Sequence, residues 1–388
     1  MELTAFLLLL NAGFIFAEFP YVSRTLLGKF SSFDKELGWC PQPGSEKVKF
    51  DLIMPQKLKG DMSYSFDQDG GRTCHCDPGV EHLISTYGDS FCFCREVSDE
   101  DTWQNILAKK LGIQVSNFGG GNYGLDQSLL RLKRNYPRHP TPIVVIAVTP
   151  YTFERILSVW RHYSEPGNVL AVKPRFKLVE GRLTLIENII TDKNQFMSLR
   201  TRKGSFRSLD ENYAYFKANY GFKKSNLADL ILSPGKMSYI FQVLIGKKKG
   251  DNYHTKLKQQ YLASLASRKD VRELFAKLVE DFHSDARQMG FTPVFMMLPD
   301  MANISYMQEN GSYYQDMLDS LRKSLPSLLM IDFYQHLEGR KDLNTLFVGS
   351  KWHYSPKGNK LLTEVLEAVL ETPIKQLKRK ELSCTAIQ

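Results

Sequence analysis

The sequence has no low-complexity tract, no internal repeat and no cysteine–histidine spacing typical of a zinc finger. It has no helix-turn-helix signature and no strand motif that combines aromatic and basic residues. The formal net charge is +9, but the basic residues are scattered, apart from short runs at 247–249 and 375–380. A nucleic-acid-binding domain usually gathers its positive charge on such a motif. We therefore expect no nucleic-acid partner and interpret the charge as a solvated surface with a basic tail.

Cysteine is scarce, with six residues in 388, and four of the six form two C-x-C pairs. The pairs are Cys74-His75-Cys76 and Cys92-Phe93-Cys94. Structural zinc sites usually have two to four residues between their cysteines, so this spacing is a poor match. We expect neither a metal nor another cofactor. Small core-filling side chains are the favoured interpretation of the pairs, and a disulfide or a metal site are the alternatives.

Only one apolar run approaches the length of a membrane span, and it lies at residues 3–19. This length is at the lower limit for crossing a bilayer. The run lacks the positive residues that precede a standard signal peptide, and Arg24 and Lys29 follow it instead. We expect residues 1–22 to be an N-terminal anchor that associates the protein with a membrane. The alternatives are a cleaved signal on a secreted or periplasmic protein, and a buried core helix.

Short apolar strands alternate with helical patterns through much of the chain. The continuous apolar run at 142–148 suits a central parallel strand that is covered on both faces. Alternation of strands and helices favours an α/β fold with a parallel sheet. The predicted strands are 82–87, 113–118, 142–148, 292–298 and 328–332, and the predicted helices are 103–111, 125–136 and 357–370.

The stretch between the third and fourth of these strands does not fit the alternation. Residues 176–179 and 182–186 predict a hairpin around a glycine-containing turn, and 210–245 and 257–289 are helical in pattern. We interpret about 156–255 as an insertion in one catalytic domain. That domain covers residues 80–372; an extension of loops and short strands at 23–79 precedes it, and a basic tail at 373–388 follows it.

Two reactive side chains follow the first and last predicted strands. Gly88-Asp89-Ser90 comes directly after the first strand, and His353 comes after the last. The carboxyl ends of parallel strands line the crevice where ligands bind. A serine hydroxyl is a weak nucleophile that needs a base, and imidazole is suited to that role near neutral pH. We expect Ser90 and His353 to meet, although a strand-ending turn with Ser90 as a helix cap is the simpler interpretation of the tripeptide alone.

A glycine-rich loop at residues 117–124 follows the second predicted strand. Attack on an ester creates an oxyanion, which needs backbone N–H donors, and glycine lets the backbone approach closely. A dinucleotide-binding loop would instead need G-x-G-x-x-G straight after the first strand. We expect this loop to supply oxyanion donors, with a flexible turn or a phosphate-binding loop as alternatives.

Three stretches together resemble the motif blocks of the SGNH/GDSL hydrolases. Residues 84–91 (ISTYGDSF) are similar to the first block, and 353–359 (HYSPKGN) to the final histidine block. Residues 115–127 (VSNFGGGNYGLDQ) resemble the second block of a subgroup with N-x-G-x-x-G-Y-G-x-D-Q. The resemblance implies a flavodoxin-like three-layer α/β/α sandwich. It also implies hydrolysis or acyl transfer through an acyl-serine, without a metal.

The resemblance assigns Ser90 as the nucleophile and His353 as the base. It places the N–H groups of Ser90 and Asn122 in an oxyanion hole, with Gly124 and the Thr152 hydroxyl as further members. Asn122 stands where the subgroup usually has glycine, and Thr152 stands in for the asparagine of the third block. Asparagine tolerates the left-handed backbone better than most residues.

A second departure lies in the last block, where the family usually carries an aspartate two or three residues before the histidine. Here those positions are Lys351 and Ser350, so the carboxylate that orients the histidine is missing or comes from elsewhere. Tyr123, Glu154 and Arg155 lie beside the expected crevice and are candidates for substrate binding.

These residues favour a serine esterase or deacylase that acts on a small-molecule or glycan ester. Aromatic residues of the insertion, Trp160, Tyr163 and Phe176, suit a sugar or a lipid-like substrate. The alternatives are a glycan O-acyltransferase of the cell envelope and a catalytically impaired binding protein that keeps the SGNH fold.

Overall fold

The computed structural model describes residues 31–44, 48–49, 63–77, 79–159, 172–195, 250–350 and 353–385. The expected anchor at 1–22 and the helical pattern at 210–245 lie outside these ranges, and both stay predictions. Among the helices of the described ranges, none combines the length and the apolar character needed to cross a membrane.

The centre of the molecule is a five-stranded sheet in which every neighbouring pair is parallel. Its spatial order is β11-β10-β7-β5-β6, which reads 2-1-3-4-5 from the other edge when the strands are numbered along the chain. This is the flavodoxin-like order. The predicted α/β class with a parallel sheet is therefore confirmed. The strands are β5 (His82–Gly88), β6 (Gln114–Gly119), β7 (Ile143–Val148), β10 (Thr292–Met297) and β11 (Leu329–Asp332).

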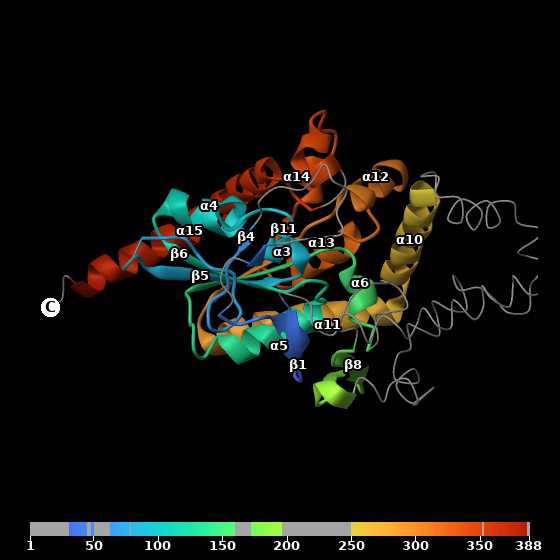
Figure 1. Ribbon diagram of the computed structural model, residues 1–388, viewed down its shortest axis with the longest axis horizontal. Coiled ribbons are helices and arrows are strands. Elements are labelled where there is room, and N and C mark those ends of the chain that lie inside the picture. The colour runs from blue at the N-terminus through green and yellow to red at the C-terminus, as the bar shows by residue number, and fades with distance from the viewer. Residues whose placement is uncertain are drawn as a thin grey trace, which may run out of the picture.

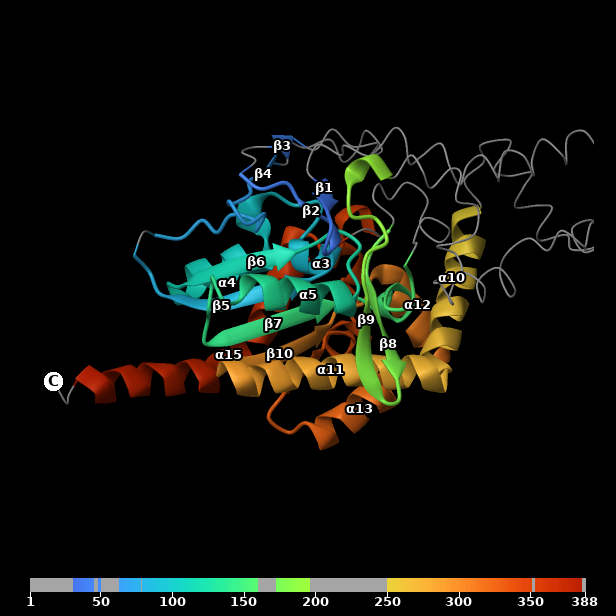
Figure 2. The ribbon, with the colours of Figure 1, turned by 90° about the horizontal axis from the view of Figure 1, so that it is seen from below.

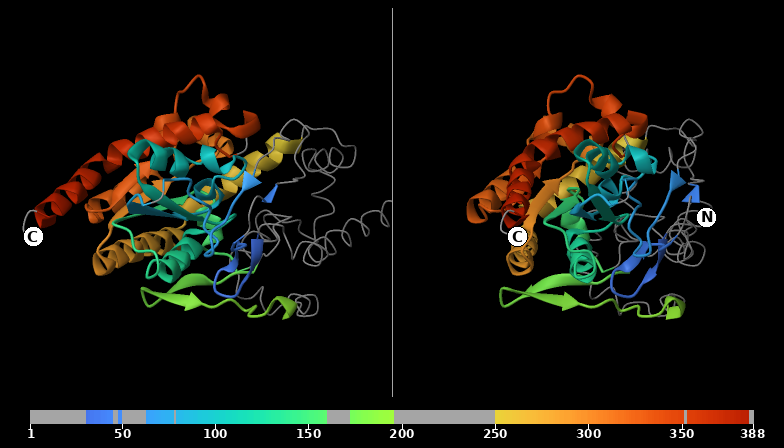
Figure 3. Two further views of the ribbon diagram at one scale, coloured as in Figure 1. Left: turned by 60° about the vertical axis from the view of Figure 1, so that its left-hand side comes forward. Right: turned by 90° about the vertical axis from the view of Figure 1, so that its left-hand side faces the viewer.

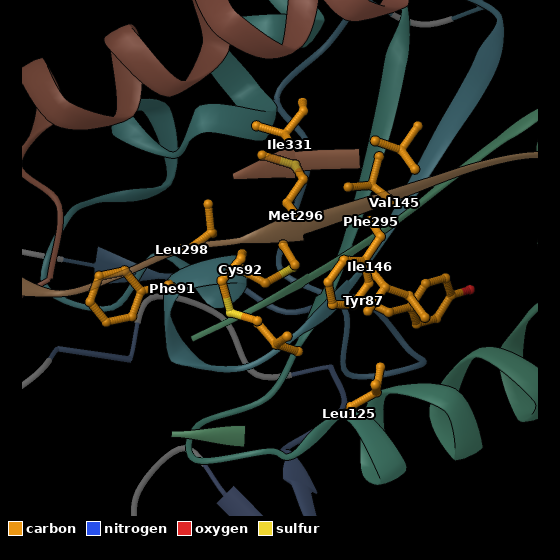
Figure 4. Close-up of a cluster of buried hydrophobic side chains, with 14 of the residues drawn as sticks. Tyr87, Phe91, Cys92, Leu125, Val145, Ile146, Phe295, Met296, Leu298 and Ile331 are labelled. Atoms are coloured by element: carbon orange, nitrogen blue, oxygen red, sulfur yellow. The ribbon is translucent and has the colours of Figure 1, made fainter. Parts of the chain in front are cut away.

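Helices cover both faces of the sheet and give three layers (Figure 1). Helices α4 (Trp103–Leu111) and α15 (Pro356–Thr385) pack together on one face, and α5 (Leu125–Asn135) and α11 (Lys269–Met289) on the other. Strand β7 is buried along its whole length, as expected of a central parallel strand. Figure 4 shows the apolar side chains that gather between the layers.

The last helix is longer than the sequence pattern predicted. Helix α15 continues past residue 370, through Pro373, to Thr385, and its end projects away from the body of the molecule (Figure 2). The first part of the expected basic tail is therefore helical.

The predicted hairpin is present, between β7 and helix α10 (Gly250–Ser267). Strands β8 (Arg175–Val179) and β9 (Arg182–Ile186) pair antiparallel around Glu180 and Gly181. Both turn residues have positive φ, 50° and 73°, as a tight two-residue hairpin turn requires. The hairpin lies along one side of the molecule (Figure 3).

The extension before the sheet contains only short strands and is attached to the loops at the carboxyl ends of the sheet. Its strands are β1 (Ser31–Asp34), β2 (Gly38–Pro41), β3 (Val48–Lys49) and β4 (Ser63–Tyr64). Trp39 Nε1 donates a hydrogen bond to the carbonyl oxygen of Gly121 at 2.7 Å. Arg72 forms an antiparallel bridge with Asn117 on β6. The extension therefore packs against the glycine-rich loop and the edge strand.

Candidate active site

Ser90 lies at the point where the strand order of the sheet reverses. It is the first residue of the short helix α3 (Ser90–Phe93), directly after β5, and β5 has β6 on one side and β7 on the other. Gly88 makes this abrupt turn possible, because a Cβ atom there would lie 1.8 Å from the carbonyl oxygen of Ala147. Ligands of this fold bind at such a switch point. The chain thus places a serine hydroxyl at the usual ligand site.

Asp89 holds the turn that carries Ser90. Its Oδ1 accepts a hydrogen bond from the N–H of Phe91 at 2.9 Å, which caps α3. Its Oδ2 accepts from the N–H and the hydroxyl of Thr149, at 3.0 and 2.7 Å, at the end of β7. A fourth donor is Arg155, whose Nη1 lies 2.8 Å from the same oxygen. Asp89 is fully buried, so its role is to fix the turn.

His353 comes from the other end of the chain and faces Ser90. The two atoms Nε2 of His353 and Oγ of Ser90 are 2.8 Å apart, which is a hydrogen-bond distance. The backbone around the histidine is fixed, because the N–H of Val348 donates to the His353 carbonyl at 2.9 Å. Its ring packs against Phe91, with ring centroids 4.6 Å apart. The structure therefore brings the predicted nucleophile and base into contact.

Glu96 lies behind the imidazole and was missed by sequence reasoning. Its Oε2 is 3.2 Å from Nδ1 of His353 and accepts a hydrogen bond from the backbone N–H of the same residue at 3.1 Å. The Nδ1–Oε2 contact has the distance of an ion pair and does not meet the geometry of a hydrogen bond. Glu96 comes from the loop after α3, six residues beyond Ser90, so no spacing near the histidine indicated it.

The carboxylate form of Glu96 is favoured. Burial on its own raises the pKa of this carboxyl group, because it disfavours the charged form. The hydrogen bonds and the charge of His353, together with the charge of Arg95, lower it by more, so the net pKa lies below its usual value. A negative charge therefore stands on the side of the imidazole away from Ser90.

Two of the expected oxyanion donors are backbone N–H groups, one at the start of α3 (Ser90) and one in the glycine-rich loop (Asn122). Asn122 has a φ of 61°, the left-handed backbone that the sequence allowed for. The N–H of Ser90 is the first of α3, where a helix offers no acceptor of its own. Within the described ranges, neither this N–H nor that of Asn122 donates to another protein group. Both remain the predicted donors.

The other two predicted members of the oxyanion hole have partners within the protein, and their role stays a prediction. The N–H of Gly124 donates to Oε1 of Gln127 at 3.3 Å, so it already has an acceptor. Thr152 begins the short helix α6 (Thr152–Arg155) and is fully buried. Its hydroxyl oxygen accepts from the N–H of Leu125 at 3.0 Å, which joins α6 to the start of α5.

The three residues predicted to contact substrate are buried and have partners within the protein. The Tyr123 hydroxyl donates to the carbonyl oxygen of Trp39 at 2.5 Å. The Glu154 carboxylate pairs with Lys258 on α10, and Arg155 pairs with Asp89. Loop position and polarity suggested exposure, but partners far along the chain cover these side chains.

A second carboxyl group lies on the far side of the site, after β10. Asp300 caps helix α12 (Met301–Asn310) and accepts a hydrogen bond from the Tyr151 hydroxyl at 2.9 Å. Burial raises the pKa of Asp300, although the neighbouring His353 opposes the shift. Of these two carboxyl groups, Glu96 is the one in contact with the His353 ring.

The cysteine pairs are not disulfides in the part of the chain that the structure describes. Cys92 and Cys94 are buried, and Cys92 lies among core side chains in Figure 4. Burial raises the pKa of both thiols. The core-filling interpretation is confirmed for this pair, whereas Cys74 and Cys76 are half-buried. Among the described residues, no group of three or more histidine, cysteine or acidic side chains is arranged to hold a metal ion.

No family model matches the sequence, and no curated protein matches it. Several solved structures are similar to the chain at low identity and low TM-score. A protein from Desulfitobacterium hafniense DCB-2 described as of the G-D-S-L lipolytic family has 13% identity and a TM-score of 0.33, with 75% of this chain and 100% of that chain covered. The esterase EstA from Pseudoalteromonas sp. has 12% identity and a TM-score of 0.34, with 76% and 100% covered.

A lipase/acylhydrolase from Enterococcus faecalis has 10% identity and a TM-score of 0.37, with 75% of this chain and 96% of that chain covered. The three structures are thus described as a lipolytic protein, an esterase and a lipase/acylhydrolase.

Proposed function

We propose that the protein is a serine hydrolase that cleaves a carboxylic ester through an acyl-serine intermediate. The observation that carries the proposal is the 2.8 Å distance between Ser90 Oγ and His353 Nε2 at the switch point of the sheet. A nucleophile and its base need this reach. The serine is 5% exposed and therefore almost fully buried.

The first half of the reaction forms the acyl-serine. Ser90 Oγ attacks the carbonyl carbon of the ester, and its proton passes to Nε2 of His353. The N–H groups of Ser90 and Asn122 stabilise the negative oxygen of the tetrahedral intermediate. The intermediate collapses when the C–O bond to the alcohol breaks, and the imidazolium protonates the departing oxygen.

The second half releases the acid. Water takes the place of the alcohol. His353 removes a proton from this water, and the water oxygen attacks the acyl carbon. Collapse of this second intermediate returns the proton to Ser90 Oγ and frees the carboxylic acid. The substrate we propose is an ester of a small molecule, a carbohydrate or a lipid. Of the aromatic residues that suggested a sugar or lipid, Trp160 and Tyr163 lie outside the described residues, and Phe176 is buried.

The test is hydrolysis of p-nitrophenyl acetate by the purified full chain. Replacement of Ser90 by alanine should lower kcat by at least about 10³-fold. The nucleophile is then missing, and His353 has no hydroxyl to deprotonate, because the two residues act as a unit. His353→Gln should cause a loss of similar size. Ser284→Ala, on α11 and remote from the site, is the matched control and should leave kcat unchanged.

A fluorophosphonate probe distinguishes the alternatives. It should label Ser90 in the folded wild-type protein, with the modified peptide identified by mass spectrometry. Equal hydrolysis by the wild type and Ser90→Ala, or no labelling of the folded wild type, would contradict the proposal and favour a binding protein. Labelling together with slow hydrolysis and rapid acyl transfer to an added glycan would favour the acyltransferase.

A further inference from the structure

We propose that Glu96, from the loop after the nucleophile, is the positioning residue that orients His353, and that Arg72 and Tyr64 of the N-terminal extension hold it in place. The inference rests on the proposed function, because the imidazole needs an orientation only if it serves Ser90. The last motif block has Ser350 and Lys351 where an aspartate would be expected. The carboxylate is supplied instead by a residue 257 positions away from the histidine.

The contacts of Glu96 favour a proton on one of the two ring nitrogens of His353. One carboxylate oxygen, Oε2, lies 3.2 Å from Nδ1 and 3.1 Å from the backbone nitrogen of His353. An oxygen that can only accept favours a proton on Nδ1, and Nε2 is then left with a lone pair toward Ser90 Oγ. Glu96 is 5% exposed, so water weakens this interaction little.

The charged and titratable groups around the pair are few. Glu96 interacts with His353, Arg95 and Tyr64, and the charge of His353 also acts on Asp300. The carboxyl group that contacts Nδ1 is the one whose pKa is lowered, and Asp300 is the one whose pKa burial raises. The electrostatics therefore favour Glu96 as the carboxylate partner.

The loop that carries Glu96 has an unusual backbone. Cys94 has a φ of 59° and Glu96 a φ of 75°, so two of three successive residues that are not glycine are left-handed. Such conformations cost free energy and persist only where the surroundings fix them, and they cluster at functional sites. Here the conformation directs the Glu96 side chain toward the histidine loop.

Arg72 is the side chain that fixes this loop. Its guanidinium donates to the carbonyl oxygens of Phe93, Cys94 and Val97, at 2.9, 2.6 and 2.5 Å. Its Nε is 2.6 Å from Oδ1 of Asp99, at the far end of the same loop.

Tyr64 is the second side chain that holds the loop of Glu96. Its hydroxyl oxygen accepts a hydrogen bond from the N–H of Glu96 at 2.8 Å, and its ring packs 4.3 Å beneath the Arg72 guanidinium. Arg72 and Tyr64 both belong to the segment before the sheet, and both are buried. That segment is therefore part of the active-site framework.

The test compares three variants that make small changes. Glu96→Gln keeps the shape and removes the charge, Glu96→Asp keeps the charge on a shorter side chain, and Glu100→Gln makes the same chemical change at an exposed site in the same region. We expect kcat for p-nitrophenyl acetate to fall by up to about 10⁴-fold in Glu96→Gln, as when the carboxylate of a serine-protease triad becomes an amide. KM should be unchanged, Glu96→Asp should recover part of kcat, and Glu100→Gln should match the wild type.

A spectroscopic measurement separates positioning from simple structural support. The Nδ1–H proton of His353 should give a far-downfield ¹H NMR signal when it faces a carboxylate. The signal should be present in the wild type and Glu100→Gln, and absent in Glu96→Gln, while thermal unfolding shows that each variant is folded. Tyr64→Phe removes only the oxygen that accepts from the Glu96 N–H, and it should lower kcat several-fold and shift the same signal.

The outcomes distinguish the two proposals. If the wild-type activity does not depend on Ser90, the proposed function fails and the present inference fails with it. If the activity depends on Ser90 but Glu96→Gln keeps wild-type kcat and the downfield signal, only the role of Glu96 is overturned.

Discussion

Arg155 and Asp89 form a buried ion pair directly behind the nucleophile, with Nη1 and Oδ2 2.8 Å apart and both side chains at most 5% exposed. The same guanidinium donates to the carbonyl oxygen of Tyr123 at 3.0 Å. One arginine thus joins the turn that carries Ser90 to the glycine-rich loop and to α6. The turn that carries Ser90 and the glycine-rich loop therefore both depend on Arg155.

Arg155→Met should strongly destabilise the protein, because it leaves the Asp89 carboxylate buried without its charged partner. Loss of one member of such a pair costs about 3–5 kcal/mol. Urea unfolding monitored by circular dichroism measures the change in the free energy of unfolding. Arg322→Met, which breaks a half-exposed pair with Asp319, is the control and should cost at most about 1 kcal/mol. Equal losses in the two variants would contradict a special role for the buried pair.

The three consecutive glycines 119–121, of which the first ends β6, should differ sharply in their tolerance of alanine. A Cβ atom at Gly119 would lie 2.3 Å from the backbone nitrogen of Phe93, whereas one at Gly121 would meet no atom within 4 Å. Gly119→Ala should lower the free energy of unfolding by about 1–3 kcal/mol, because backbone must move. Gly121→Ala should leave it unchanged within about 0.5 kcal/mol. Denaturant unfolding of both variants is the measurement, and a larger loss for Gly121→Ala would show that the close approach at Gly119 is misassigned.

The left-handed backbone of Asn122 predicts which substitutions the oxyanion loop accepts. Asn122→Gly should keep kcat within a few-fold, because glycine adopts positive φ freely. Asn122→Val should lose activity, since a β-branched residue at a φ of 61° is strained by about 1–3 kcal/mol and moves the N–H away. Ester hydrolysis and fluorophosphonate labelling are the readouts. A valine variant as active as the glycine variant would remove Asn122 from the oxyanion hole.

Asp332 predicts a specific pH dependence of stability. It ends β11, is 1% exposed, and burial raises its pKa from 3.8 to about 6. Between about pH 4 and pH 6 the folded protein keeps a proton that the unfolded chain has released, so the free energy of unfolding falls as the pH rises through this range. Asp332→Asn removes the cost of ionising this buried carboxyl group. The variant should therefore have a free energy of unfolding at pH 7 that is higher by up to about 3 kcal/mol.

Below about pH 3 the wild type and Asp332→Asn should be nearly equally stable, because the wild-type carboxyl group is then neutral in both states. Asparagine keeps an Oδ1 acceptor for the N–H of Tyr334 and the hydroxyl of Tyr314, which both lie 3.1 Å from the wild-type Oδ1. Urea unfolding at a series of pH values measures the difference. A gap between the two proteins that does not change with pH would exclude titration of Asp332 as its cause.

The fold was predictable because its signals are local. The apolar run at 142–148 became β7, the helix that starts at Trp103 ends at Gly112, and the Glu180-Gly181 turn became the hairpin turn. Topology then brings Ser90 and His353 to one edge, since each follows a strand of the same parallel sheet. Periodicity and strand order together therefore predict the scaffold and its reactive pair.

The rest of the site depends on contacts between distant segments, which a single sequence does not display. Glu96 reaches the histidine through left-handed backbone at a residue type that seldom adopts it, so no motif indicates the position. Glu154 and Arg155 are polar loop residues, and only the positions of Lys258 and Asp89 decide that they are buried. Residue type predicted the chemistry of these side chains but not their surroundings.

The attachment of Arg72 across the edge strand β6 also bears on how the protein can be divided. A recombinant fragment that starts at His82 would retain the whole sheet together with Ser90, Glu96 and His353, yet lack the guanidinium that organises the loop between them. Such a truncation would remove the hydrogen bonds that Arg72 and Tyr64 make to the loop that carries Glu96. The shortest fragment that keeps these bonds begins upstream of Tyr64.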